Sequence, residues 1–482
     1  MKRHIRIGLS ALLLLLSAHL VSSAGVQQSV LSQTQTVYPV GVNVVLNLSN
    51  IASRNHLSMG VQFADEANSI ISSSELESDF AACSFSMVRI SLGQWWGPCR
   101  SWNETRHTGT YDWKLFDETV NLINNGGCKL LICANRPPAG MPLQDTGFPD
   151  PSSFSAYVRD IAVHMKESGW TSAVWEVWNE PYEVFGWSNI NETRMMAYID
   201  LFNNVSESIH EILPTALVGS SACSDKLFLK KFTNFGRDVG FLGFHMYNAF
   251  GTWLCNTAGY YDNQTVLIRA TQGNVGDSNY VNPERMKEIW YATRNETLPI
   301  FCTETNLNGE FMNGTDPRQQ DIIGAVWYAE ELRGFILEGV SRSIYYQFAS
   351  DDSPDWNTTK QTKGFGFGMV RSTVPFTKWY PYYFNYLLAN RLSEDDPLYE
   401  TSSDKPDTVS VIAWSHNSRL EILLICKVPE SVVIYTNGIS GNFTMLKIDS
   451  TNTGIAAMKY ESNSLTVNGY CVVLLEKAGQ GE

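Results

Sequence analysis

Short apolar runs recur along the chain and are separated by longer stretches in which apolar residues are spaced three and four positions apart. The short runs are typical of buried β-strands and the longer stretches of amphipathic helices. Eight runs read as strands: 57–63, 86–92, 129–134, 173–178, 216–220, 240–246, 299–303 and 343–348. The clearest helical patterns cover 112–124, 152–168, 192–212 and 321–338. Eight strands alternating with helices predict an α/β fold, a closed (β/α)8 TIM barrel.

The pattern changes after an aromatic helical stretch at 379–392. Short β-type runs follow, at 409–414, 420–426, 432–435, 443–448 and 470–475. Such meandering strands fit an additional C-terminal β-sandwich domain. We therefore expect a catalytic barrel over 57–392 and a β-sandwich over 393–482, with the strand-like residues 40–47 of the N-terminal segment 25–56 contributing a strand to the sandwich.

The first 24 residues have the layout of a secretory signal peptide. Three basic residues (Lys2, Arg3 and Arg6) precede an apolar block at 9–21 and the small residues 22–25. This order predicts cleavage after Ala24 and export from the cytoplasm. The apolar block is short for a membrane anchor, so we expect a secreted protein or one in an exocytic compartment.

Two further features fit an exported glycoprotein. Nine Asn-X-Ser/Thr sequons begin at Asn47, Asn103, Asn191, Asn204, Asn263, Asn295, Asn313, Asn357 and Asn442. The nine cysteines form no Cys-x-x-Cys pair, which disfavours zinc. Export permits disulfides, and Cys83 with Cys99 and Cys426 with Cys471 are plausible local pairs. Cys302 is expected to be a buried free thiol.

Charge narrows the range of partners. The formal net charge is −14, which argues against nucleic acid or an anionic membrane surface, because both bind a basic face. The net charge neither favours nor opposes the binding of a neutral glycan. The sequence contains no nucleotide, flavin or His-Glu-x-x-His metal motif, so we expect no cofactor and no metal. The oligomeric state stays open.

Two carboxyl groups lie where predicted strands end. The run Trp-Glu-Val-Trp-Asn-Glu-Pro at 175–181 stops at a corner that carries Glu180, and the strand-like residues 298–303 lead to Glu304. The carboxyl ends of all strands in a barrel meet around one mouth, which predicts that the two glutamates face each other. Paired carboxyl groups of this kind are used to hydrolyse glycosidic bonds.

These motifs resemble the retaining glycoside hydrolases of clan A, and within that clan family 39, the β-xylosidases and α-L-iduronidases. The resemblance spans about residues 57–392. It implies that Glu180 is the acid/base and Glu304 the nucleophile. A pocket beside Trp178 is expected to raise the pKa of Glu180 enough to hold a proton near neutrality. Glu310, in a Gly- and Asn-rich stretch, is the rival for Glu304.

The resemblance also assigns substrate-binding residues around the two acids. Arg89 and the pair His245 and Tyr247 are expected to keep Glu304 ionised, and Asn179 is expected to hydrogen-bond the 2-hydroxyl of the sugar. The alternatives are a core ion pair for Arg89, a core histidine for His245 and a turn asparagine for Asn179.

Aromatic residues are candidates for stacking on sugar rings, although tryptophan is more often a core residue. Trp95, Trp96 and Trp187 follow predicted strands. At the eighth strand the tryptophan expected in clan A is absent, and Tyr346 lies in that region. This departure leaves the substrate open.

The sequence therefore predicts a secreted retaining glycoside hydrolase that cleaves β-glycosidic bonds in oligo- or polysaccharides by double displacement, with a xylan- or glucan-type sugar as the first substrate to consider. An exo-glycosidase or transglycosylase of clan A family 5, 30 or 51 is an alternative. A non-catalytic carbohydrate-binding surface glycoprotein is the alternative from another class.

Overall fold

The computed structural model describes residues 39–477, except for 65–66, 94–96, 187–189, 248–261, 271–279, 310–315, 351–365 and 440. Within these residues, no helix has both the length and the apolar character needed to cross a membrane.

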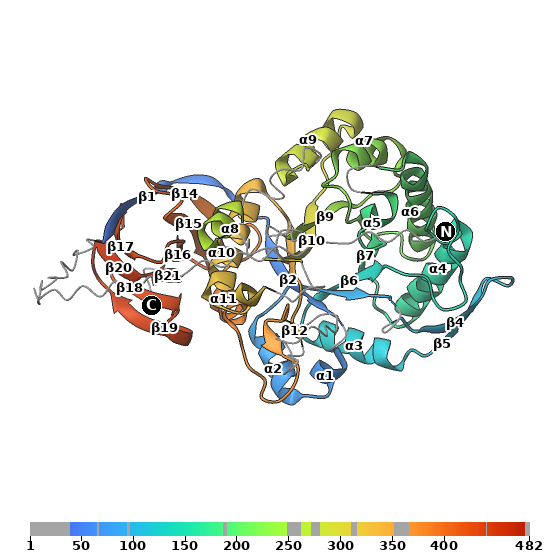
Figure 1. The fold of residues 1–482 in the computed structure, drawn as a ribbon, viewed down its shortest axis with the longest axis horizontal. Coiled ribbons are helices and arrows are strands. Elements are labelled where there is room, and N and C mark those ends of the chain that lie inside the picture. Colours follow the sequence, from blue (N-terminus) through green and yellow to red (C-terminus); the bar gives the residue numbers. More distant parts are fainter. Residues whose placement is uncertain are drawn as a thin grey trace, which may run out of the picture. The chain divides into compact units, whose positions relative to one another are not determined.

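Eight parallel strands close into a barrel in the order β10-β11-β2-β3-β6-β7-β8-β9 (Figure 1). They are β2 (Ser58–Phe63), β3 (Met87–Ser91), β6 (Lys129–Ala134), β7 (Val174–Val177), β8 (Val218–Ser220), β9 (Phe241–Tyr247), β10 (Ile300–Asn306) and β11 (Arg342–Tyr345). The predicted TIM barrel is confirmed, and each predicted strand overlaps one of these eight. The main differences are that β8 is shorter than expected, β10 continues past Glu304, and β11 ends before Tyr346.

The long helices follow the sequence pattern closely. The four predicted from periodicity are α3 (Lys114–Asn125), α4 (Pro151–Glu167), α6 (Glu192–Ile212) and α10 (Ile322–Glu338). The predicted aromatic helix at 379–392 is shorter, as α11 (Tyr380–Leu388). The other α-helices are α1 (Ala67–Ile71), α2 (Ser74–Ala82), α5 (Tyr182–Phe185), α7 (Lys226–Phe235), α8 (Asn263–Arg269) and α9 (Pro283–Arg294).

The barrel interior has an apolar floor and a polar layer above it. The floor consists of alternate strand residues that form one buried cluster: Met87, Leu131, Val174, Phe241, Phe301 and Ile344. Side chains two positions along a strand point to the same face. The inward residues that follow Met87 and Val174 are Arg89 and Glu176, both fully buried. The site is therefore built on the strands themselves.

A nine-stranded sheet forms the second part of the structure, in the order β19-β18-β21-β16-β15-β14-β1-β17-β20. Its members are β1 (Val40–Arg54), β14 (Pro397–Ser403), β15 (Val409–His416), β16 (Arg419–Cys426), β17 (Ser431–Asn437), β18 (Phe443–Asp449), β19 (Asn452–Tyr460), β20 (Ser464–Asn468) and β21 (Cys471–Lys477). The N-terminal strand β1 pairs with β14 and β17, and Figure 1 shows it in blue among red strands.

Sequence patterns missed some strands. The sheet strands β14, β19 and β20 were not predicted, nor was the antiparallel hairpin of β4 (Cys99–Asn103) and β5 (Thr108–Tyr111). In β14 only one of seven residues is fully buried. A strand of this kind lacks the clear alternation that marks a half-buried strand.

The sheet has two apolar faces with different partners. Residues such as Ile422 and Leu424 belong to a core within the sheet, whereas Leu423 and Ile425 belong to the cluster that also holds the barrel helices. A polar contact also joins the sheet to a barrel helix. Oε1 of Glu330 in α10 lies 3.1 Å from Nζ of Lys427, which follows β16.

The predicted cysteine pairs are not formed. Cys83, Cys99, Cys426 and Cys471 are all free thiols. Cys83 caps α2, and Cys99 begins β4. Cys426 and Cys471 do lie opposite each other on β16 and β21. Cys302 is buried and free, as predicted.

Candidate active site

Glu180 lies in a tight turn that follows β7. The backbone adopts a positive φ at Trp178 (68°) and at Glu180 (46°), a conformation that non-glycine residues take uncommonly and that costs about 1–3 kcal/mol each. Packing holds the turn, because the Trp178 ring meets Phe148 edge-on with centroids 5.1 Å apart. The Tyr198 hydroxyl also donates to the Val177 carbonyl at 2.7 Å. The strained turn aims Glu180 over the barrel mouth.

Glu304 lies inside β10, directly after a register irregularity between Cys302 and Glu304. Two donors hold its carboxylate. Nη1 of Arg89 donates to Oε2 at 2.9 Å, and the hydroxyl of Tyr247 donates to Oε1. Arg89 and Tyr247 thus hold the two oxygens of the Glu304 carboxylate in place.

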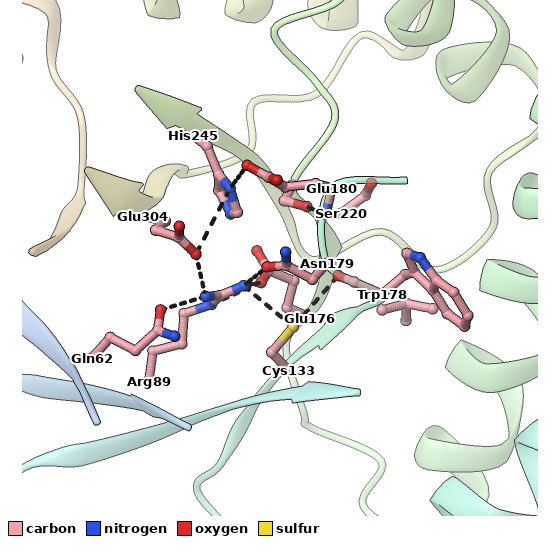
Figure 2. A network of polar contacts seen from close by, with 12 residues as sticks. Gln62, Arg89, Cys133, Glu176, Trp178, Asn179, Glu180, Ser220, His245 and Glu304 are labelled. Atoms are coloured by element: carbon pink, nitrogen blue, oxygen red, sulfur yellow. Dashed lines mark hydrogen bonds and ion pairs between the residues drawn. The ribbon is translucent and has the colours of Figure 1, made fainter. Parts of the chain in front are cut away.

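Arg89 is the centre of the buried network (Figure 2). Its guanidinium donates to Glu176 Oε2 from Nε at 2.9 Å and to Asn179 Oδ1 from Nη2 at 2.7 Å. It also contacts Gln62 Oε1 and Cys133 Sγ. Both contacts considered for Arg89 are present, since it forms a core ion pair with Glu176 and also contacts Glu304.

His245 contacts the other glutamate. Its Nδ1 lies 2.8 Å from Glu180 Oε1 and 3.9 Å from Glu304 Oε2. The hydroxyl of Tyr182 donates to the same Glu180 oxygen at 2.7 Å. His245 therefore faces Glu304, as expected, but it lies nearer to Glu180, because the turn after β7 carries Glu180 back over the end of β9.

This pairing reverses the expected pKa shift of Glu180. Burial acts to raise the pKa of Glu180, but the hydrogen bond and charge of His245 outweigh it and hold that pKa below its ordinary value. Burial lowers the pKa of His245, while the charges of Glu304 and Glu180 raise it above its ordinary value. This direction is opposite to the rise in the pKa of Glu180 that the sequence predicted.

Glu180, Glu304 and His245 converge on one small space. One carboxylate oxygen from each glutamate and one ring nitrogen of His245 all lie within 4.8 Å of one another. Carboxyl groups of retaining glycosidases are about 5–5.5 Å apart and those of inverting enzymes about 6.5–9.5 Å. The separation here is on the retaining side. These three residues could also hold a metal ion, although both carboxylates already accept hydrogen bonds from protein groups.

Of the remaining predicted residues, Asn179 belongs to the cluster. Arg89 occupies its Oδ1, which leaves the Nδ2 group as the donor to offer a ligand. Tyr346 follows β11, and its ring packs against Phe367 with centroids 5.3 Å apart. The predicted Trp95, Trp96 and Trp187, and the rival Glu310, lie outside the described residues.

Sequence reasoning missed several members of the site. Glu176, Gln62 and Cys133 hold Arg89, and Tyr182 holds Glu180. The signal for the first three was their inward position on neighbouring strands, which becomes visible only once the barrel register is known. Glu176 lay within the motif itself but was interpreted as part of the strand.

Asn135 is a further residue that the sequence did not single out. Leu131 is in the barrel floor and the Sγ atom of Cys133 is 3.3 Å from Arg89 Nη2, so strand alternation directs residue 135 to the same face, one step nearer the mouth. Its Oδ1 is buried and has no hydrogen-bond partner among the described residues. A Cβ on Gly93 would lie 3.2 Å from this amide, so the glycine leaves it room.

Comparisons with known proteins give the fold a context. The sequence matches no protein-family model and no curated protein. Among solved structures, it is similar to a GH39 β-xylosidase from Caulobacter crescentus (TM-score 0.62, 16% identity, covering 90% of this chain and 99% of that one).

Two other solved structures show the same likeness. One is an α-L-arabinofuranosidase from Thermotoga maritima (TM-score 0.61, 11% identity, 90% and 99% covered). The other is a GH30 endoxylanase from Clostridium papyrosolvens C71 (TM-score 0.54, 14% identity, 91% and 100% covered). The resemblance to clan A is therefore confirmed at the level of the fold, along the length of the barrel and the sheet.

Proposed function

We propose that this protein is a retaining β-glycoside hydrolase with Glu304 as nucleophile and Glu180 as acid/base. The observation that carries the proposal is the approach of the two carboxylates to within 4.8 Å, one from the turn after β7 and one from within β10. The donors on Glu304 and the fold shared with glycoside hydrolases support it.

In the first step Glu304 attacks the anomeric carbon while Glu180 donates a proton to the leaving oxygen. Arg89 and Tyr247 hold the two Glu304 oxygens, which fixes the direction of attack. In the second step Glu180 takes a proton from water, and that water displaces Glu304. Two displacements at one carbon retain its configuration.

Glu180 provides the proton, and the charge of His245 changes how firmly Glu180 holds it. Burial lowers the pKa of His245, and the charge of Glu304 is the strongest of the effects that raise it. That charge is consumed as Glu304 bonds to the sugar. The pKa of His245 then falls, so His245 lowers the pKa of Glu180 less, and Glu180 becomes a better base for the proton of the attacking water.

We propose that two amides contact the sugar. The Nδ2 group of Asn179, whose Oδ1 is taken by Arg89, would donate to the 2-hydroxyl, and the amide of Asn135, whose Oδ1 has no partner among the described residues, would contact another hydroxyl of the same sugar. A site built to pair with a hydroxyl rejects an analogue that lacks it. We propose that Asn135 and Asn179 contribute to the selectivity of the catalytic subsite.

For the substrate, we propose a β-linked sugar of the xylose or glucose type. We also propose that the protein acts outside the cytoplasm, as the N-terminal signal pattern indicates. Solved structures of similar fold include a β-xylosidase, a bifunctional glucanase-xylanase and a glucosidase, which makes these sugars the first to test.

The test is hydrolysis of a panel of aryl β- and α-glycosides, followed by proton NMR of the first sugar released. The proposal predicts turnover of at least one β-glycoside with initial release of the β-anomer. Initial release of the α-anomer from a β-glycoside would contradict the retaining assignment. Binding of oligosaccharides without any bond cleavage across aryl glycosides and natural glycans would favour the carbohydrate-binding alternative.

A further inference from the structure

A fully buried glutamate lies behind the site, on the outer face of β10. Glu304 points into the barrel, so the next residue, Thr305, points outward, onto helix α10. There its Oγ1 lies 2.6 Å from Oε1 of Glu331 and 2.8 Å from the carbonyl oxygen of Met246 in β9. Thr305 and Glu331 have no exposed surface.

The hydrogens in this chain of contacts can be counted. A threonine hydroxyl has one hydrogen to donate, and a carbonyl oxygen can only accept. If Thr305 donates to Met246, the contact with Glu331 requires a hydrogen from Glu331. A neutral carboxylic acid satisfies both contacts at once, whereas a carboxylate would compete with the Met246 carbonyl for one hydrogen.

The surroundings favour the neutral acid as well. Glu331 Oε2 has no hydrogen-bond partner among the described residues, and an uncompensated buried carboxylate is costly. Among the described residues, the titratable groups that interact with Glu331 include Cys302, Tyr280, Tyr328 and Tyr345, and none of these four is cationic. Burial raises the pKa of Glu331 well above its ordinary value.

The position of this chain links it to the catalytic residues. Met246 lies between His245 and Tyr247, and Thr305 follows Glu304. The register pairs Thr305 with Met246 across β9 and β10. The hydrogen bond between Thr305 and Met246 therefore fixes the register of β10 against β9 just after the irregularity in β10. This register sets the position of Glu304 relative to His245 and Tyr247.

We propose that Glu331 is a positioning residue that acts as a neutral acid, locking β9 to β10 through Thr305 so that Glu304 meets Tyr247 and His245 in register. The inference rests on the proposed hydrolase function for its activity readout. A displacement of the order of 1 Å in a catalytic group can cost about a hundredfold in rate.

The test compares Glu331→Gln, which keeps a neutral donor, with Glu331→Met, which keeps the length but removes the donor. We expect Glu331→Gln to stay within about twofold of the wild type and Glu331→Met to lose about tenfold or more in kcat with little change in KM. The matched control is the neighbouring Glu330→Met, which removes the contact with Lys427 of the C-terminal sheet and should lower the melting temperature without lowering kcat.

Several results would overturn the proposal. One is a Glu331→Met variant that melts earlier but keeps its kcat, and another is a Glu331→Gln variant as impaired as Glu331→Met. If Glu331→Met does not fold, Thr305→Val against Thr305→Ser applies the same test to the hydroxyl.

An infrared difference spectrum between the wild type and Glu331→Gln at neutral pH should show the C=O stretch of a protonated carboxylic acid, and a carboxylate signal there would also overturn the proposal. This spectrum needs no substrate. A wild type inactive on every glycoside would therefore count against the hydrolase proposal while the infrared result still decides the protonation of Glu331.

Discussion

The Nδ1 atom of His245 lies 2.8 Å from Oε1 of Glu180, so the group proposed as acid/base is paired with an imidazole. The pairing lowers the pKa of Glu180 despite its burial. An acid catalyst must be protonated in the free enzyme, so the pKa of Glu180 sets the basic limb of the pH dependence of kcat/KM. A lowered pKa therefore predicts an acidic optimum.

Replacing His245 tests this relationship. In His245→Gln the imidazole charge is lost, and burial, which raises the pKa of Glu180, is less opposed. We expect the basic limb of the kcat/KM profile to move to higher pH, whatever the loss in absolute rate. Tyr182→Phe removes a weaker effect on the same oxygen and should move the limb less. An unchanged limb in His245→Gln would contradict the pairing.

Arg89 connects stability and activity. Arg89→Met would leave the carboxylates of Glu176 and Glu304 without their cation, and breaking a buried pair in this way costs about 3–5 kcal/mol. Denaturant unfolding should show this loss, and turnover should fall sharply. The double variant Arg89→Met with Glu176→Gln removes one of the uncompensated charges. It should regain stability but not activity, and a double variant no more stable than Arg89→Met would contradict this account.

Asn135 is tested by changing the enzyme and the substrate together. We expect Asn135→Ala to lose about tenfold in kcat/KM, the value of a hydrogen bond of ordinary strength. On a substrate that lacks the partner hydroxyl, the kcat/KM of the wild type should fall by a similar factor. The kcat/KM of the variant should fall little further on that substrate. A series of monodeoxy aryl β-glycosides identifies that hydroxyl. Losses that multiply for every deoxy position would show that Asn135 makes no direct contact.

Glu421 links stability to pH. Its side chain is fully buried in β16, its oxygens lack partners among the described residues, and burial together with the charge of Glu476 raises its pKa to about 8. The folded state thus keeps a proton that the unfolded chain releases near pH 4.3. The contribution of Glu421 to stability is present below that pH and falls as pH rises towards 8.

Glu421→Gln removes this dependence. Calorimetry should show a higher melting temperature than the wild type at pH 8, by a few degrees, and little difference at pH 4. The melting temperature of Glu476→Gln at the two pH values is the comparison. This variant also removes the charge beside Glu421, but it breaks the ion pairs of Glu476 with Arg391 and Arg419. Equal effects of Glu421→Gln at both pH values would contradict the assignment.

The sequence could predict the barrel and the positions of both glutamates because eight short apolar runs alternate with helical stretches and two of these runs lead to a glutamate. It could not predict that His245 binds Glu180. That contact depends on the positive φ angles at Trp178 and Glu180, and no residue preference in a Trp-Asn-Glu corner signals them.

Buried polar residues were missed for a related reason. Glu331 lies in a helix whose apolar pattern was recognised, but the pattern does not tell which of its charged residues face inward. In α10 both Glu330 and Glu331 are buried, each against a different partner. Such partners come from distant parts of the chain, so only the assembled fold reveals them.

The assignment of Glu304 as nucleophile is tested most directly by chemical rescue. In Glu304→Gly the carboxylate is replaced by a space that azide can enter from the same face. With an activated aryl β-glycoside, added azide should restore turnover and yield the α-glycosyl azide, the product of a single inversion. Failure of azide to rescue Glu304→Gly, together with rescue of Glu310→Gly to the same product, would contradict the account.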